Sequence, residues 1–287
     1  MVACSFSIPG DWTRTLAGDS IQIETLAGPN TDLHAYQPTP QDVRKLLQAD
    51  LIVGIDPLVE PWLNEISKSN NMTNKVLWLG RPWVSDAGAP PCPCGDPKHA
   101  HTQPAGAPQD DPHVWMDAAL VEKMVDALAT RLIQLPGVSK DGLEARRAAY
   151  VAAIRQVDQE AADLFKAIPR EKRLVITHHG NLGRFAKRYG IEVAGVVLQT
   201  STTEAADPSA RSLARLAEIV RTRNVRVLVL DRGQRAPAAF ALARETGLAP
   251  PLALSIDSLD QPGAPAGDWV GMLRDNARTL SAAMTTR

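Results

Sequence analysis

Short apolar runs alternate with helix-like segments along nearly the whole chain, and this alternation most constrains the fold. Runs of four to eight apolar residues bounded by polar or turn-forming residues are typical of buried strands. Such runs lie at residues 2–8, 21–26, 51–55, 76–79, 173–177, 193–198, 225–230 and 252–256. Because helical patterns recur between the runs, the sequence predicts α/β units built on parallel strands.

The longest helical pattern separates the first four runs from the last four. Ser139 is a suitable N-cap and Pro169 follows the last periodic residue, so we expect a helix over 140–167, about 40 Å long. The sequence therefore predicts two α/β lobes, at 1–138 and 169–287, joined by a linker helix within 139–168. Each lobe would hold a roughly four-stranded parallel sheet flanked by helices. The residues expected on the buried face of the linker helix are Leu143, Tyr150, Ile154, Val157, Ala161, Leu164 and Ile168.

Composition excludes some classes of protein. A chain of 287 residues, 44% of them hydrophobic, can bury a large core and form about two domains of ~150 residues each. Its formal net charge of −1 gives no field that would attract a phosphate backbone, so we expect no nucleic-acid partner. No apolar run reaches the ~20 residues that a membrane span requires. A strand-like run starts at Val2 without a basic and apolar leader before it, so we expect a cytosolic chain or one whose signal peptide was removed.

The chain has three cysteines, an odd number that does not identify a compartment. Val2-Ala3-Cys4 resembles a lipidation site, but the strand pattern begins at once, so we expect Cys4 to be buried and structural. Cys92 and Cys94 are poorly placed to bridge each other, which leaves Cys4 with either of them as the pairing to test.

A loop over 82–110, rich in proline, glycine, alanine and aspartate, interrupts the alternating pattern. Its Cys-x-Cys and His-x-His pairs are suited to collecting a borderline-soft ion such as zinc, although an incidental polar loop is the alternative. The four residues of this candidate auxiliary metal-collecting loop are Cys92, Cys94, His99 and His101.

Histidine is rare, with six residues in the chain. His34, His113 and His179 each stand where an apolar or loop segment gives way to polar residues. A single histidine is more often a hydrogen-bonded core or surface residue than a ligand. Three separated imidazoles in similar settings instead suggest one assembled metal site.

Several local motifs accompany these histidines in a fixed order. His34 lies in a glycine- and proline-containing stretch at 28–40, His113 in Asp111-Pro112-His113, and His179 within 175–190. Further along come Ala206-Asp207-Pro208-Ser209, Ser255-Ile256-Asp257-Ser258-Leu259 and the stretch 267–272. In order and spacing, these motifs resemble the metal-specific solute-binding proteins of bacterial ABC transporters, the zinc and manganese group that includes ZnuA and TroA. The resemblance covers nearly the whole chain.

The resemblance implies four metal ligands from four loops lining the cleft between two lobes: His34, His113, His179 and Asp257. Of the adjacent pair His178 and His179, the family's motif aligns its ligand with His179. Alternation along a strand also lets only one of the two readily face the cleft. His178 and Glu60 are then candidates for residues that support the ligands.

Three imidazoles and one carboxylate suit a tetrahedral zinc ion, whereas Mn²⁺ would be expected to have more oxygen ligands. In the manganese-type relatives the third ligand is commonly a carboxylate, and here it is His179.

The chain departs from the family at Leu33, Gly180, Asn181 and Arg184. These departures concern the surroundings of the ligands. We expect the other acidic residues near the motifs to be solvated or to cap helices rather than to bind metal: Glu60, Asp111, Glu204 and Asp231.

The function implied by the resemblance is that of a monomeric periplasmic receptor, not an enzyme. It would capture zinc and deliver it to an ABC permease, and a periplasmic zinc chaperone is a further candidate partner. A metallochaperone without its own permease would use the same ligands. A zinc hydrolase is the alternative from another class, but four protein ligands leave no position for water, and the chain has no His-Glu-x-x-His motif.

Overall fold

The computed structural model describes residues 1–84, 111–198 and 208–285, which form two parallel four-stranded sheets. The first has the order β2-β1-β3-β4 and the second β6-β5-β7-β8, so both follow the same topology. All eight predicted strands are present, with ends within two residues of the predicted ones; the last two residues predicted for the first strand, Ser7 and Ile8, instead begin a helix. Their bounds are β1 Val2–Phe6, β2 Ile23–Ala27, β3 Leu51–Gly54, β4 Val76–Trp78, β5 Leu174–Thr177, β6 Glu192–Val196, β7 Val227–Asp231 and β8 Leu252–Leu254.

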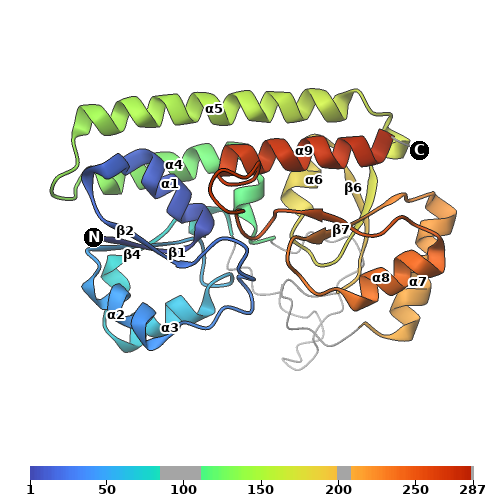
Figure 1. The fold of residues 1–287 in the computed structure, drawn as a ribbon, viewed down its shortest axis with the longest axis horizontal. Helices are drawn as coiled ribbons and strands as arrows, with labels where there is room; N and C mark the ends of the chain where they lie inside the picture. The colour runs from blue at the N-terminus through green and yellow to red at the C-terminus, as the bar shows by residue number, and fades with distance from the viewer. Residues whose placement is uncertain (85–110, 199–207, 286–287) are drawn as a thin grey trace, which may run out of the picture.

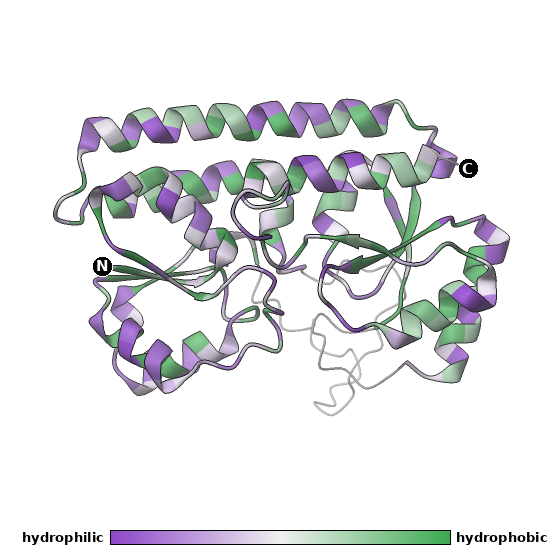
Figure 2. Ribbon diagram, in the orientation of Figure 1, coloured by the Kyte–Doolittle hydropathy of each residue, from purple (hydrophilic) through white to green (hydrophobic). Residues whose placement is uncertain are grey.

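Helices cover both faces of each sheet (Figure 1). In the N-terminal lobe, α2 and α3 pack on one face and α1 and α4 on the other, and in the C-terminal lobe α7 and α8 lie opposite α6 and α9. The strands are mainly hydrophobic, whereas the helices carry both kinds of residue (Figure 2), as burial of both sheet faces requires. The helix bounds are α1 Ser7–Ala17, α2 Pro40–Gln48, α3 Pro61–Ser69, α4 Ala118–Leu132, α5 Lys140–Lys166, α6 Gly183–Tyr189, α7 Ala210–Arg223, α8 Pro237–Thr246 and α9 Trp269–Thr285.

The long helix α5 spans both lobes and ends within one residue of its predicted limit. Its predicted N-cap is confirmed, because the Ser139 hydroxyl accepts a hydrogen bond from the Gly142 amide at 3.3 Å. One residue of the predicted buried stripe is wrong: Leu164 is 37% exposed, whereas Phe165 is fully buried. The C-terminal lobe packs against the Phe165 edge of the stripe, where this ring contacts Phe185 and Tyr189.

A single hydrophobic cluster extends through both lobes beneath α5. It joins side chains of β1 and α1 to those of β5, α6 and α9, and side chains of α5 belong to it as well. Helix α9 begins at the junction of the lobes, where the Trp269 amide donates to the Asp11 carboxylate at 3.0 Å and its indole to the Trp115 carbonyl at 2.9 Å. The lobes therefore share a core, which opposes their independent movement.

The predicted burial of Cys4 is confirmed: the side chain is fully buried, and burial raises its pKa to about 11. Its thiol forms no disulfide with any described residue and contacts the Thr13 hydroxyl at 3.3 Å. The pairing partners considered for it, Cys92 and Cys94, lie outside the described residues. In the described ranges, no helix combines the length and the apolar character that crossing a bilayer demands. The boundaries predicted for the lobes, at residues 139 and 169, stay a prediction.

Candidate metal centre

The four predicted ligands come together at the carboxyl ends of the strands, where the two lobes meet. His179 lies two residues beyond β5, Asp257 three residues beyond β8, and His34 in the loop that follows β2. His113 directly precedes a short 3₁₀ turn, Val114–Met116, that leads to α4. Ligand sites in parallel α/β sheets form outside these strand ends, because loops of neighbouring strands diverge there.

Local hydrogen bonds fix the backbone of the three histidines. The amide of His34 donates to Asp32 at 3.0 Å, and the amide of Met116 donates to the His113 carbonyl at 3.0 Å. The carbonyl of His179 accepts from the Thr177 hydroxyl at 2.6 Å and from the Asn181 amide at 2.9 Å. Short turns of this kind direct the side chains without help from a regular element.

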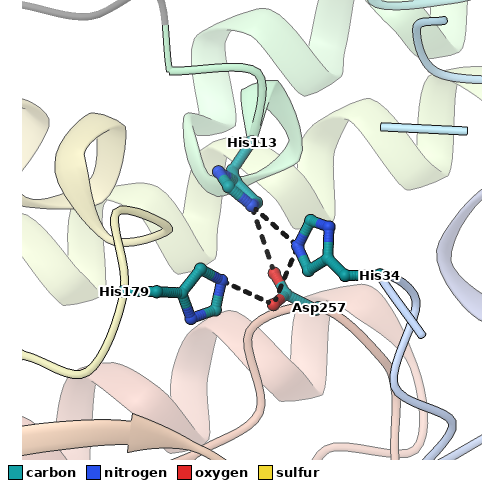
Figure 3. A group of neighbouring side chains, drawn as sticks. All are labelled: His34, His113, His179 and Asp257. Atoms are coloured by element: carbon teal, nitrogen blue, oxygen red, sulfur yellow. Dashed lines mark hydrogen bonds and ion pairs between the residues drawn. The ribbon is translucent and has the colours of Figure 1, made fainter. Parts of the chain in front are cut away.

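The donor atoms of the four side chains converge on one point (Figure 3). Nε2 of His113 lies 3.4 Å from Nε2 of His34 and 3.7 Å from Oδ1 of Asp257. Oδ2 of Asp257 lies 3.6 Å from Nε2 of His34 and 3.2 Å from Nε2 of His179. One donor atom from each residue can be chosen so that all lie within 4.8 Å of one another. A tetrahedral ion with bonds of about 2.0–2.1 Å separates its ligands by about 3.4 Å, so the spacings are close to those that zinc requires.

The burial of these side chains indicates that they serve a ligand. Their exposed fractions are 2% for His34 and 0% for His113, His179 and Asp257. Despite the close contact with Asp257 Oδ2, neither ring nitrogen of His179 makes a hydrogen bond within the described ranges, and neither does Oδ1 of Asp257. Buried polar atoms without partners are costly to folding. A cation bound at this point would provide His179 Nε2 and Asp257 Oδ1 with a partner.

The electrostatics also suit a cation. Burial alone would raise the pKa of Asp257, but contacts with the imidazoles of His179 and His34 lower it well below its usual range. The pKa of His179 is lowered, chiefly by burial. At neutral pH the centre thus offers a charged carboxylate and an unprotonated imidazole, which are the states that bind metal.

Two further carboxylates support the ligands, and both differ from the expectation of solvated acidic residues. Oδ1 of Asp111 lies 2.6 Å from Nδ1 of His113 and also accepts from the His113 amide at 3.0 Å. This contact turns Nε2 of the ring toward the centre. Asp231 is buried and accepts from the amides of Ile256 and Asp257 at 2.6 and 3.3 Å, which fixes the loop that carries the fourth ligand.

An amide contacts the fourth ligand directly, because Nδ2 of Asn181 donates to Oδ2 of Asp257 at 3.1 Å. For two of the three supporting residues, Asp111 and Asp231, the position in the sequence could have indicated a place beside the ligands. Asp111 stands two residues before a histidine ligand, and Asp231 is the last residue of β7, at the same edge as the ligands. No local signal pointed to Asn181, whose partner lies 76 residues away.

The two residues expected to support the ligands have other partners. His178 is buried beside His179, and its Nδ1 lies 3.2 Å from the Gln234 side-chain oxygen. Glu60 is fully buried and accepts from the Ser5 hydroxyl at 2.5 Å and from the amides of Ile55 and Asp56. None of these partners is among the four converging residues. The loop residues Cys92, Cys94, His99 and His101, and also Glu204, lie outside the described residues.

A family model described as ZnuA, zinc-uptake complex component A, periplasmic, matches residues 2–283 of the chain. The chain belongs to this family. ZnuA-family proteins bind solutes for metal ABC transporters and are not enzymes, which confirms the predicted class of protein.

Relatives of this ZnuA-family chain carry names with different metals. It is 26% identical to the metal ABC transporter substrate-binding lipoprotein FimA of Streptococcus parasanguinis, over 99% of this chain and 89% of the relative. It is 25% identical to the manganese ABC transporter substrate-binding lipoprotein PsaA of Streptococcus pneumoniae, over 98% of this chain and 87% of the relative. An iron ABC transporter substrate-binding lipoprotein, MtsA of Streptococcus pyogenes, is 24% identical over 98% and 87%.

Solved structures show the same fold. The periplasmic zinc binding protein TroA from Treponema pallidum matches with a TM-score of 0.83 at 24% identity, over 99% of this chain and 98% of TroA. A Mn-bound periplasmic metal binding protein from Candidatus Liberibacter asiaticus matches with a TM-score of 0.76 at 22% identity, over 99% and 98%. The comparisons therefore identify the fold and the class of protein. They do not identify the metal, because the relatives are named for different ions.

Proposed function

We propose that this chain captures one Zn²⁺ ion at His34, His113, His179 and Asp257 and delivers it to an ABC permease in the inner membrane. It would act in the periplasm as a monomer. The observation that carries the proposal is the convergence of three imidazole nitrogens and one carboxylate in a buried centre between the lobes. The periplasmic description of the matching family model and the transporter names of the relatives support the compartment and the partner.

The donor set favours zinc over Mn²⁺ or Fe²⁺. Imidazole nitrogen suits zinc, whereas Mn²⁺ prefers carboxylate, carbonyl and water oxygen. Asp257 is the one carboxylate among the four, and its Oδ2 already accepts a hydrogen bond from Asn181. That bond weakens Oδ2 as an additional metal ligand and favours a four-coordinate site with three nitrogens and one oxygen.

The closed arrangement favours carrying a metal over using it in catalysis. A catalytic zinc keeps one position for water, whereas four protein side chains would complete the shell of a tetrahedral ion in this centre. A metallochaperone would share the ligands and would differ in its partner. The auxiliary metal-collecting loop, Cys92, Cys94, His99 and His101, belongs to the proposal as a place where zinc is first held before it reaches the centre.

The direct test is equilibrium binding to the metal-free protein against a chelating competitor, with Zn²⁺, Mn²⁺ and Fe²⁺ in parallel. We expect one zinc per chain, bound more tightly than either of the other ions. Tighter binding of Mn²⁺ or Fe²⁺ would contradict the assignment of zinc. Metal-dependent hydrolysis of an ester or amide would favour the enzyme alternative instead. Transport of zinc by cells that carry a permease encoded beside this chain, and its loss on deletion of the chain, would separate the receptor from a chaperone.

A further inference from the structure

Arg184, in the first turn of α6, joins the C-terminal lobe to the segment that carries His113. Its amide donates to Oδ2 of Asp111 at 3.0 Å, and its Nε donates to the Asp111 carbonyl at 2.5 Å. Its Nη2 donates to the carbonyl of Trp83 at 2.8 Å. One arginine thus holds two separate parts of the N-terminal lobe, with three hydrogen bonds to two residues.

Asp111 connects Arg184 to His113, one of the four converging residues. The two oxygens of the carboxylate have different partners: Oδ2 accepts from the backbone amide of Arg184, and Oδ1 lies 2.6 Å from Nδ1 of His113. The guanidinium of Arg184 holds the backbone of the same residue through the Asp111 carbonyl. A carboxylate that is fixed at both oxygens restricts the rotation of the imidazole it contacts.

The chain around Arg184 is built for this close approach. Gly183 precedes it, and a Cβ at that position would lie 2.8 Å from Oδ2 of Asp111. Any larger residue at 183 would therefore displace the carboxylate. The loop that carries His179 leads into the same helix, so Arg184 and His179 belong to one short segment.

We propose that Arg184 is a positioning residue for the metal centre, which sets the place of His113 relative to His179 through Asp111. A ligand from before the linker helix is thereby aligned with a ligand from after it, without a bond between the two imidazoles. The inference rests on the proposed metal binding at His113, whichever ion is bound. Loss of the Arg184 side chain should therefore change the metal affinity and the geometry of the ligands around the ion. Loss of a contact that only joins the lobes would change neither.

Arg188, one turn further along α6, provides a matched control. It also joins the lobes, since it donates to Asp117 at 2.9 Å and forms a paired contact with Asp158 of α5. Neither partner is hydrogen-bonded to a metal ligand in the described parts of the chain. Arg184→Ala and Arg188→Ala should both lower the melting temperature of the metal-free protein. The first removes two side-chain hydrogen bonds to backbone carbonyls, and the second removes ion pairs with Asp117 and Asp158.

The two variants should differ in metal binding. For Arg184→Ala we expect a zinc dissociation constant about 10- to 100-fold higher than that of the parent, the range typical when a support of a metal ligand is lost. Arg184→Lys, which keeps the charge but loses the planar set of donors, should lie between the two. Arg188→Ala should bind zinc as the parent does. The visible absorption of bound Co²⁺, which reports the geometry of the ligands, should change in Arg184→Ala and not in Arg188→Ala.

A cycle with Asp111→Asn tests the route of the effect. If Arg184 acts through Asp111, the double variant should lose less affinity than the sum of the two single losses. Parent-like zinc affinity in Arg184→Ala, or an equal loss in Arg188→Ala, would overturn the inference. A parent that prefers Mn²⁺ would refute zinc as the cargo, and the same comparison made with Mn²⁺ would still decide the role of Arg184. A parent that binds no metal would refute both.

Discussion

Replacing His179 by alanine should remove most of the metal-dependent stabilisation of the protein. The side chain is fully buried and faces the centre, and neither ring nitrogen makes a hydrogen bond in the described structure. Its loss therefore costs the metal-free fold packing but no hydrogen bond of the ring. The effect should appear in the metal-bound state, where one of four ligands is missing.

The size of the effect follows from mass action. Zinc present at a thousandfold excess over its dissociation constant stabilises the parent by about 4 kcal/mol. A chain of this length gains about 2 °C for each kcal/mol, so the parent should melt about 8 °C higher with zinc. Binding at zinc sites releases about 10–16 kcal/mol, and one quarter of that, about 2.5–4 kcal/mol, corresponds to a loss of about 70- to 900-fold in affinity. At the same free zinc, His179→Ala should then gain about 0.4–1.6 kcal/mol, a shift of about 1–3 °C.

Differential scanning calorimetry of chelator-treated protein, with free zinc held constant by a metal buffer, measures both shifts. His178→Ala is the matched control, because this neighbouring histidine is also buried but pairs with Gln234 and is not one of the four converging residues. It should keep the full shift of the parent. A full zinc shift in His179→Ala, or its loss in His178→Ala, would show that the wrong imidazole has been assigned to the metal.

Three other changes test separate parts of the argument. Asn181→Ala frees Oδ2 of Asp257, so the ratio of zinc to Mn²⁺ affinity should fall in competition titrations, and an unchanged ratio would contradict the role given to that hydrogen bond. Burial raises the pKa of Glu60 to about 7, so its ionisation opposes folding and its stabilising effect is lost as the pH rises from about 4.5 to 7. Urea unfolding of the metal-free protein at pH 5 and pH 8 should therefore show a smaller difference in unfolding free energy between the two pH values in Glu60→Gln than in the parent. An identical pH profile in the two proteins would refute the assignment. The last change replaces the four residues of the auxiliary metal-collecting loop, Cys92, Cys94, His99 and His101. It should slow zinc loading in stopped-flow measurements without changing the equilibrium affinity, and unchanged loading would exclude a collecting role.

The strands and the linker helix could be predicted from the sequence because their signals are local. A strand buried on both faces is a continuous apolar run, and Ser139 marks the start of α5 by the hydrogen bond its hydroxyl accepts. Leu164 was assigned wrongly because the helix pattern shows a stripe but not which edge of it meets the neighbouring helices. The position of α9 beside α5 had no local signal either, since it depends on contacts such as that of Arg274 with Glu160, 114 residues away.

The four residues of the metal centre came from ordered motifs, whereas their supports depend on tertiary contacts. Asp111 was placed among solvated carboxylates because a local sequence does not show that Arg184, 73 residues later, lies against it. The same holds for Asn181, which faces Asp257 only after β5 and β8 have joined one sheet. Departures from the family pattern at 181 and 184 were noticed in the sequence, but their meaning required the partners that the fold provides.

The shared topology of the two sheets explains how residues 34 and 257 come to surround one point. Each sheet places the carboxyl ends of its parallel strands toward the junction of the lobes, so the loops that leave those ends meet there. The N-terminal lobe contributes two imidazoles, and the C-terminal lobe contributes one imidazole and the carboxylate of Asp257. The negative charge of the four ligands therefore lies on the C-terminal side. In the proposed site His34 and His113 would complete the coordination from the opposite side, and the contact of Arg184 with Asp111 would fix the position of His113 relative to His179.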